Sequence, residues 1–232
     1  MAFNLLKFVL PNRFVRTRIW RGPFRGARIV MNPRDSLRKI VGLYEHELNE
    51  WLEEALRRVH RVLDVGANDG YFTFGCAAAF RRLGKEGNII AFEPQPRHVA
   101  ILRKSVTSQK PSNVRFRIMQ TIVGKELKLR MTTLDAVRWD TGEPTDKTKT
   151  LVKIDVEGAE LDVVEGARSW LHPSNLFVIE VQEERFVDQL RALFGEHDLR
   201  LVPQTQNPLP FIGREVREAN NSWLVSALDA LP

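Results

Sequence analysis

The sequence predicts an α/β fold in which helices cover both faces of a doubly wound, mostly parallel sheet. Short apolar runs of strand length alternate along the chain with longer segments whose apolar residues recur every three or four positions. Several of these runs end in an acidic residue or a glycine, as expected where parallel strands deliver polar groups to one edge of the sheet. At 232 residues the chain can form one such domain and still carry an appendage.

The first strand of this sheet is predicted at residues 62–65, directly before a turn that contains glycine. Gly66 and Gly70 permit positive φ and let the main chain approach a ligand closely. The apolar, alanine-rich segment 71–80 follows as a buried helix. A strand, a glycine turn and a helix in this order direct loop amides and a helix N-terminus into one crevice, which predicts a nucleotide-type pocket. A dinucleotide site is not predicted, because Asn68 stands where that motif requires glycine.

The other predicted elements continue the alternation. An amphipathic helix is expected over residues 43–59, a polar loop over residues 139–149, and a hairpin that turns at Gly124 and Lys125 into residues 127–131. Further strands are expected at residues 88–92, 114–118, 151–156, 176–181, 199–202 and 223–225. Further helices are expected to begin at Pro96, to bury apolar positions within residues 163–170, and to end at Gly195.

The composition contains a single cysteine, Cys76, which has no partner for an internal disulfide. This favours a reducing, cytoplasmic setting. No run approaches the ~18 apolar residues that a membrane-spanning helix needs.

Positive charge is concentrated at the start of the chain. Residues 1–30 hold seven Lys and Arg residues and no Asp or Glu, whereas the net charge of the whole chain is +6, so the rest is close to neutral and a nucleic-acid partner is not expected. Two interpretations are open. The segment binds an anionic membrane surface and is dispensable for folding, which would place the protein peripherally at a membrane, or it packs on the domain with its arginines in solvent. Pro11, Gly22 and Pro23 interrupt any long helix, which favours packing.

Three blocks of sequence each lie at the end of a predicted strand: DVGANDG at residues 64–70, AFEP at residues 91–94 and KIDVEGAE at residues 153–160. In this order the three blocks resemble the FkbM family of S-adenosylmethionine-dependent methyltransferases. Residues 1–42 fall outside the resemblance and form a basic extension, and residues 43–232 form the methyltransferase domain. The resemblance implies a Rossmann-like class I methyltransferase fold, with seven strands in the order 3-2-1-4-5-7-6 and the last strand antiparallel.

The resemblance also implies S-adenosylmethionine as the cofactor, bound between the glycine turn and the acid at the tip of the second strand. That acid, Glu93, is placed to accept hydrogen bonds from both ribose hydroxyls, since a carboxylate has several acceptor sites. The residues expected to bind the cofactor are Asp64, Gly66, Ala67, Asn68, Gly70, Glu93 and Pro94. No metal site is predicted, because no two acids have a spacing that demands one, although carboxylates clustered at this edge could hold Mg²⁺.

Catalysis is expected at the tips of the fourth and fifth strands. A hydroxyl acceptor must lose its proton, so Asp155 and Glu180 are candidate bases, and Asp155 would need its pKa raised by desolvation. Lys153 shares a strand face with Asp155 and is either a third catalytic candidate or the ion-pair partner of that acid. His46 and His98 are expected to be surface residues on helices.

Three functional hypotheses follow from these residues. The first is an O-methyltransferase that acts on a hydroxyl of a sugar, polysaccharide or secondary metabolite. The second, a nucleic-acid methyltransferase using the basic arm, is disfavoured by the near-neutral body and by the absence of an Asn/Asp-Pro-Pro-Tyr motif. The third is a binding protein on a methyltransferase fold without catalysis, supported only by a shortened segment before residues 133–135, where relatives carry a longer wall of the acceptor site.

Overall fold

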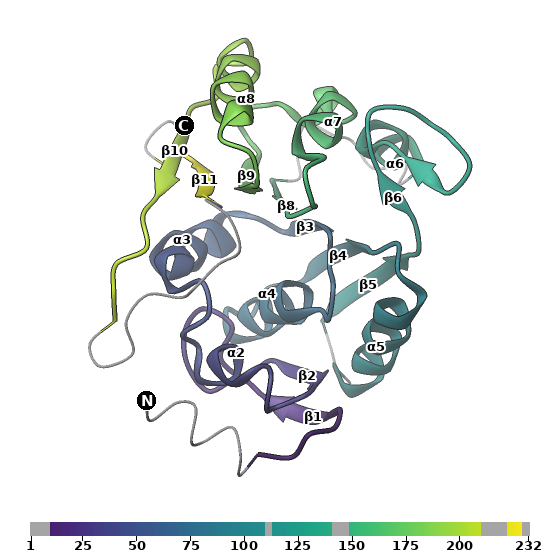
Figure 1. The fold of residues 1–232 in the computed structure, drawn as a ribbon, viewed down its shortest axis with the longest axis vertical. Coiled ribbons are helices and arrows are strands. Elements are labelled where there is room, and N and C mark those ends of the chain that lie inside the picture. Colours follow the sequence, from purple (N-terminus) through teal and green to yellow (C-terminus); the bar gives the residue numbers. More distant parts are fainter. Residues whose placement is uncertain (1–9, 110–112, 141–148, 210–221, 229–232) are drawn as a thin grey trace.

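The computed structural model describes residues 10–109, 113–140, 149–209 and 222–228. Its centre is a seven-stranded sheet in the order β10-β11-β9-β8-β3-β4-β5 (Figure 1). The strands are β3 (Arg61–Val65), β4 (Gly87–Phe92), β5 (Val114–Met119), β8 (Thr150–Ile154), β9 (Leu176–Val181), β10 (Leu201–Gln204) and β11 (Ser222–Ser226). Strand β11 runs antiparallel to its neighbours β9 and β10, and the other strand pairs in this sheet are parallel. Counted along the chain, this is the expected order 3-2-1-4-5-7-6 with the last strand antiparallel, so the predicted topology is confirmed.

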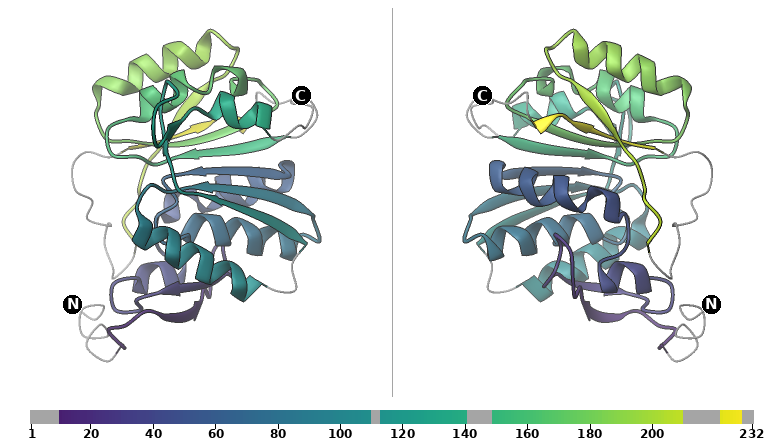
Figure 2. Two further views of the ribbon diagram at one scale, coloured as in Figure 1. Left: turned by 90° about the vertical axis from the view of Figure 1, so that its right-hand side faces the viewer. Right: turned by 90° about the vertical axis from the view of Figure 1, so that its left-hand side faces the viewer.

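Helices cover both faces of the sheet, and successive residues of a strand therefore enter different cores. Val62 packs in the core beneath α3 and α4, whereas its neighbour Leu63 packs in the core beneath α7 and α8. Figure 2 shows these helices as two layers on opposite sides of the strands. The helices are α3 (Asn49–Arg58), α4 (Tyr71–Arg82) and α5 (Pro96–Val106) on one face, and α6 (Leu134–Asp140), α7 (Glu160–Glu165) and α8 (Arg185–Gly195) on the other, with short 3-10 turns η1 (His46–Leu48), η2 (Thr107–Gln109) and η3 (Arg168–Trp170). None of the described helices is long and apolar enough to cross a membrane.

The start of the described chain forms a further layer outside α4 and α5 (Figure 2). Strands β1 (Val15–Arg18) and β2 (Arg28–Met31) pair as an antiparallel hairpin, and α2 (Leu37–Val41) follows. The backbone N–H of Val30 donates to Ser105 Oγ of α5 at 3.0 Å, which fixes β2 against that helix.

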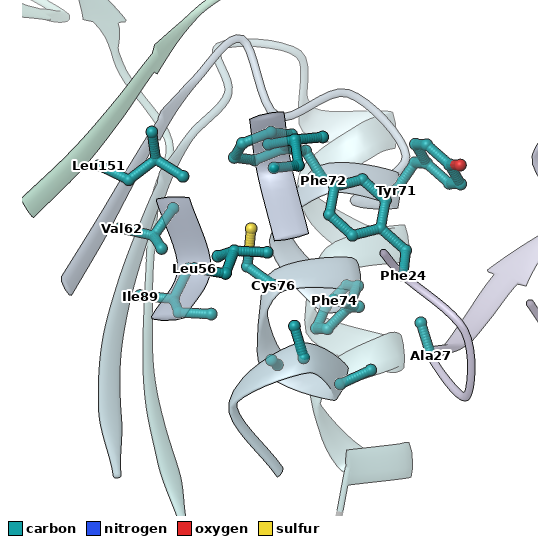
Figure 3. Close-up of a cluster of buried hydrophobic side chains, with 14 of the residues drawn as sticks. Phe24, Ala27, Leu56, Val62, Tyr71, Phe72, Phe74, Cys76, Ile89 and Leu151 are labelled. Atoms are coloured by element: carbon teal, nitrogen blue, oxygen red, sulfur yellow. The ribbon is translucent and has the colours of Figure 1, made fainter. Parts of the chain in front are cut away.

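Apolar side chains of this layer belong to the same core as the domain. Ile19 is fully buried and Phe24 is 3% exposed. The Phe24 ring meets the Tyr71 ring of α4 edge to face, with centroids 5.1 Å apart (Figure 3). Removing such side chains would take several kcal/mol of apolar burial from the domain, at about 1.5–3 kcal/mol for each large residue. The expectation that this segment is dispensable for folding is therefore wrong for its described part, which packs on the domain.

The expected hairpin at Gly124 and Lys125 does not form. Strands β6 (Ile122–Val123) and β7 (Met131–Thr132) pair in parallel instead. The chain reverses in a tight turn before β7, where Arg130 adopts a φ of 64° and Met131 N donates to Lys128 O at 3.0 Å. The loop that results carries two exposed leucines, Leu127 and Leu129, away from the core.

Two helix boundaries also differ from expectation. The helix predicted from residue 43 begins as an α-helix only at Asn49, because Glu45 has a left-handed φ of 49° that an α-helix cannot continue through. Helix α6 extends to Asp140, into the segment predicted as a loop, and residues 141–148 lie outside the described part of the chain.

Candidate active site

A cavity of about 310 Å³ lies outside the carboxyl ends of β3, β4 and β8. Five of the residues expected at the site line it: Gly66, Asn68, Glu93, Pro94 and Asp155. They come from segments far apart in the sequence, and the parallel strands bring them to one edge of the sheet. A volume near 300 Å³ is at the lower end of the range for small-molecule pockets.

The glycine turn can come this close to β8 only because residue 66 has no side chain. Gly66 has a φ of +78°, and a Cβ placed on it would lie 1.9 Å from the main-chain oxygen of Asp155. Its own N–H and that of Ala67 donate to Phe92 O at 3.1 and 3.0 Å, which fastens the turn to the end of β4. Gly70 has a φ of +88° and starts α4 against Phe74. Gly70 and Ala67 therefore shape the turn from outside the cavity lining.

Glu93 is 4% exposed, and its carboxylate joins the two loops that border the cavity. One oxygen accepts the N–H of Asn68 at 2.8 Å, and the other accepts the N–H of Gln95 at 2.9 Å. A carboxylate has about four lone-pair sites, so lone pairs remain for a ligand hydroxyl. His98, expected at the surface, instead lines the cavity with Nδ1 3.7 Å from Glu93 Oε1. It faces inward because α5 turns that side chain towards the tip of β4.

Lys153 lies behind the cavity and holds together three segments. Its Nζ is 2.8 Å from Asp155 Oδ2, 3.4 Å from Asp64 Oδ1, and donates to Gly66 O at 2.8 Å. The Lys153 side chain is 6% exposed, whereas that of Asp155 is 32% exposed. Of the side chains of Lys153, Asp155 and Asp64, that of Asp155 lines the cavity. The interpretation of Lys153 as the ion-pair partner of Asp155 is confirmed.

Asp64 also differs from expectation, because it does not line the cavity. It is fully buried, accepts a hydrogen bond from Thr73 Oγ1 of α4, and faces Lys153. Burial, which Lys153 only partly offsets, raises the pKa of Asp64. We therefore assign Asp64 to the support of Lys153, and not to direct contact with a cofactor.

The charges of this group move the pKa values of Lys153 and Asp155 apart. Burial alone would lower the pKa of Lys153, but the carboxylates of Asp155 and Asp64 outweigh it and raise that pKa. Burial alone would raise the pKa of Asp155, but Lys153 and a hydrogen bond with the Glu180 side chain outweigh it and lower that pKa. The direction at Asp155 is opposite to the one expected from desolvation, because the buried cation is in direct contact with the acid.

Glu180 of β9 stands next to Asp155 and is 9% exposed. Its side chain hydrogen-bonds with Asp155 and helps to lower the pKa of that acid. The Tyr44 hydroxyl lies close enough to both acids to be affected by their charges. Its pKa is raised by burial first, and then by the charges of Glu45, Asp155 and Glu180, so the hydroxyl remains protonated.

A residue of the basic extension contacts the glycine turn, which sequence reasoning missed. Lys39 of α2 pairs with Asp69 of the glycine turn at 2.9 Å, and its Nζ lies over the rings of Tyr44 and Tyr71 at 5.0 and 5.5 Å. The two tyrosine rings meet edge to face at 5.5 Å. No local pattern marks Lys39, because one lysine in a basic segment does not stand out.

Residues 121–123 also line the cavity and were missed. They directly precede the predicted hairpin turn, and Ile122 and Val123 form β6, which pairs in parallel with β7. Within the described residues there is no group of three or more His, Cys, Asp or Glu placed to hold a metal ion.

Comparison with known proteins places this geometry in context. Residues 103–202 match the family model of the methyltransferase FkbM domain. The structure of methyltransferase FkbM from Methylobacillus flagellatus aligns with a TM-score of 0.56 and 15% identity, over 73% of this chain and 44% of that one, so the chain spans less than half of that protein. The putative methyltransferase yhhF from Escherichia coli aligns with a TM-score of 0.54 and 14% identity, over 91% of this chain and 97% of that one. A search of curated proteins gave no match. The two structures share the Rossmann-like fold with this chain.

Proposed function

We propose that this chain, whose residues 103–202 match the family model of the methyltransferase FkbM domain, is an S-adenosylmethionine-dependent O-methyltransferase. The acceptor class is a hydroxyl of a sugar, polysaccharide or secondary metabolite. One observation carries the proposal: Gly66, Glu93 and Asp155 line the same cavity, so the glycine turn, a ribose-binding acid and a proton-accepting acid converge.

The residues around the cavity fit S-adenosylmethionine. Gly66 contributes to the cavity lining, Glu93 offers acceptors for ribose hydroxyls, and Asn68 and Pro94 border the same space. When bound, this cofactor supplies a methyl group on a sulfonium, which is already a strong electrophile. The protein therefore has mainly to orient the acceptor and remove its proton.

Asp155 is the candidate that contacts the acceptor. It is the member of the Lys153, Asp155 and Glu180 group that lines the cavity, and Lys153 keeps it ionised and fixed in direction. An ionised carboxylate accepts a hydroxyl hydrogen bond, which orients the oxygen and takes up its proton as the bond to carbon forms. Glu180 and Lys153 act as positioning residues for Asp155.

Cofactor binding tests the first part of the proposal. By calorimetry, Glu93→Ala should weaken binding of S-adenosylmethionine by about 1–3 kcal/mol, because charge-assisted hydrogen bonds to the ribose are lost. Glu196→Ala, which removes an exposed acid after α8, is the matched control and should bind like the wild type. Absence of binding to wild-type protein at millimolar cofactor would end the proposal.

Turnover tests the second part. With a panel of hydroxyl acceptors and detection of the demethylated cofactor, Asp155→Asn should keep cofactor affinity and cut turnover by about 10²–10⁴-fold. Equal losses of cofactor affinity and turnover would move Asp155 into the cofactor site. Unchanged turnover in the Asp155→Asn and Glu180→Gln double variant would remove both acids from the mechanism.

Association of residues 1–30 with an anionic membrane surface stays a prediction. The described part of residues 1–30 carries exposed cations and the exposed ring of Trp20 on the hairpin. Residues 1–9 lie outside the described chain.

A further inference from the structure

A second cavity, of about 650 Å³, lies between the N-terminal hairpin and the C-terminal half of α4. It shares no lining residue with the cavity at the sheet edge. The hairpin contributes Arg18, Trp20 and Arg25, and α4 contributes Arg81 and Arg82, above a floor that includes the buried Ile19. We call it the arginine cavity.

Two of these arginines have structural partners. Arg25 and Arg82 both reach Glu53 of α3, at 2.5 and 3.3 Å. Arg82 also donates to the main-chain oxygen of Pro23 at 3.0 Å, which ties the helix to the hairpin. These bonds explain why Arg25 and Arg82 are present, and Glu53 neutralises one of their two charges.

Arg18 and Arg81 lack such compensation. Within the described part of the chain, neither forms an ion pair with a carboxylate, and the side-chain contact of Arg81 is a hydrogen bond to Gln109 Oε1 at 3.0 Å. Burial, and then the nearby cation of Arg28, lowers the pKa of Arg81. The cavity therefore concentrates positive charge that the described protein neutralises only in part.

The position of α4 accounts for some of this charge, but not for all of it. Arg81 and Arg82 lie in the last turn of the helix, where cations interact favourably with the helix dipole. Arg18 comes from a strand and gains nothing from that dipole. Trp20, 67% exposed, adds a large apolar ring at the same cavity, which a purely solvated basic surface does not require.

We propose that the arginine cavity is a binding site for a phosphate-bearing ligand, whose phosphate contacts Arg18 and Arg81 and whose organic part lies against Trp20. Guanidinium groups bind phosphate oxygens through paired, charge-assisted hydrogen bonds, so arginines converging on one cavity suit a phosphate better than a single carboxylate. A soluble phosphate ester and a phospholipid headgroup share this chemistry. Trp20 suits either source, because tryptophan packs on planar groups and also lies at lipid interfaces.

Binding to the full chain separates these sources. Inorganic pyrophosphate represents the soluble source, and vesicles of phosphatidylcholine with and without phosphatidylglycerol represent the lipid source. The test variant combines Arg18→Gln with Arg81→Gln. The control variant, Arg191→Gln, removes one positive charge from the exposed side of α8, away from the cavity. We expect the double variant to bind the probe that the wild type binds about tenfold or more weakly, and Arg191→Gln to bind that probe like the wild type. Because neither arginine pairs with a described carboxylate, thermal unfolding of the double variant should stay close to that of the wild type.

Each outcome decides the proposal. Pyrophosphate binding that the double variant loses supports a soluble phosphate ester, and vesicle binding that requires phosphatidylglycerol and is lost in the same variant supports a headgroup. If the double variant does not fold, the two single variants and Trp20→Phe take its place, and Trp20→Phe should remove the fluorescence change that ligand causes in the wild type. Absence of binding to both probes, or equal binding by wild type and the arginine variants, would overturn the proposal. Cofactor binding measured by calorimetry is independent of this result, so failure here leaves the methyltransferase proposal intact.

Discussion

Two regions of this molecule hold cations next to the same helix, α4, but carboxylates pair the cation of one region and, among the described residues, leave two cations of the other without an ion pair. Lys153 faces Asp64, Asp155 and the Gly66 carbonyl, and is 5% exposed. Arg18 and Arg81 line an open cavity, and within the described chain they form no ion pair. A buried ammonium must have partners to be tolerated at all, whereas a guanidinium at the border of a cavity can keep donors for something that arrives later. The ion pairs of Lys153 therefore stabilise the fold, whereas Arg18 and Arg81 are available to a ligand.

The largest expected effect is at Lys153. Lys153→Met should lower the free energy of unfolding by about 3–5 kcal/mol, because it leaves buried carboxylates without their cation. Chemical denaturation measures this, with Arg18→Gln as the cation control, whose effect we expect to be within about 0.5 kcal/mol. A loss below about 1 kcal/mol for Lys153→Met would break the distinction between the two regions.

A smaller effect is expected from the pH dependence that Asp155 contributes. Because the pKa of Asp155 is lowered in the folded protein, its contribution is fully present above its ordinary value of 3.8 and is lost as the pH falls through the folded value. Asp155→Asn should therefore be less stable than the wild type at neutral pH by about 1–3 kcal/mol, and the gap should narrow below about pH 4. Thermal unfolding across this range measures the gap. A constant gap would assign the loss to packing and not to ionisation.

A smaller loss of stability is expected at Arg82, whose charge is paired less completely than that of Lys153 but more than that of Arg18. Arg82→Gln removes a partly buried ion pair with Glu53 and a hydrogen bond to Pro23 O, so we expect a loss of about 1 kcal/mol in the free energy of unfolding. The double variant with Glu53→Gln should lose somewhat more, because it also breaks the pair between Arg25 and Glu53. A loss for Arg82→Gln as large as that for Lys153→Met would show that the arginine cavity is as structural as the site behind Asp155.

The sequence was sufficient for the parts of the fold that depend on local patterns. Periodicity marks the strands, and the blocks at residues 64–70, 91–94 and 153–160 lie at the ends of β3, β4 and β8. Gly66, Glu93 and Asp155 could be placed in one crevice because parallel strands carry their carboxyl ends to a common edge. The strand order itself came from the family resemblance, since no local pattern states which strands are neighbours.

Residues whose roles depend on long-range packing could not be predicted. The cations of the N-terminal segment obscure the apolar run Ile29, Val30 and Met31 that is buried in β2, so the sequence of this segment resembles a solvated arm. Asp64 sits in a motif typical of cofactor contact, but its burial against Thr73 and Lys153 depends on how α4 and β8 pack. Lys39 reaches the site only because the hairpin docks on α4, and nothing near it in the sequence encodes that docking.

The position of β11 sets a constraint on synthesis of the chain. This strand is encoded last among the described elements, but it occupies the gap between β9 and β10. Until Ser222–Ser226 has left the ribosome, the hydrogen-bonding edge of β9 stands open, and its apolar side chains, such as Val178, lack the cover of Trp223 and Val225. A nascent chain in this state presents an unpaired, apolar strand edge, the kind of surface that chaperones bind and that aggregates in their absence.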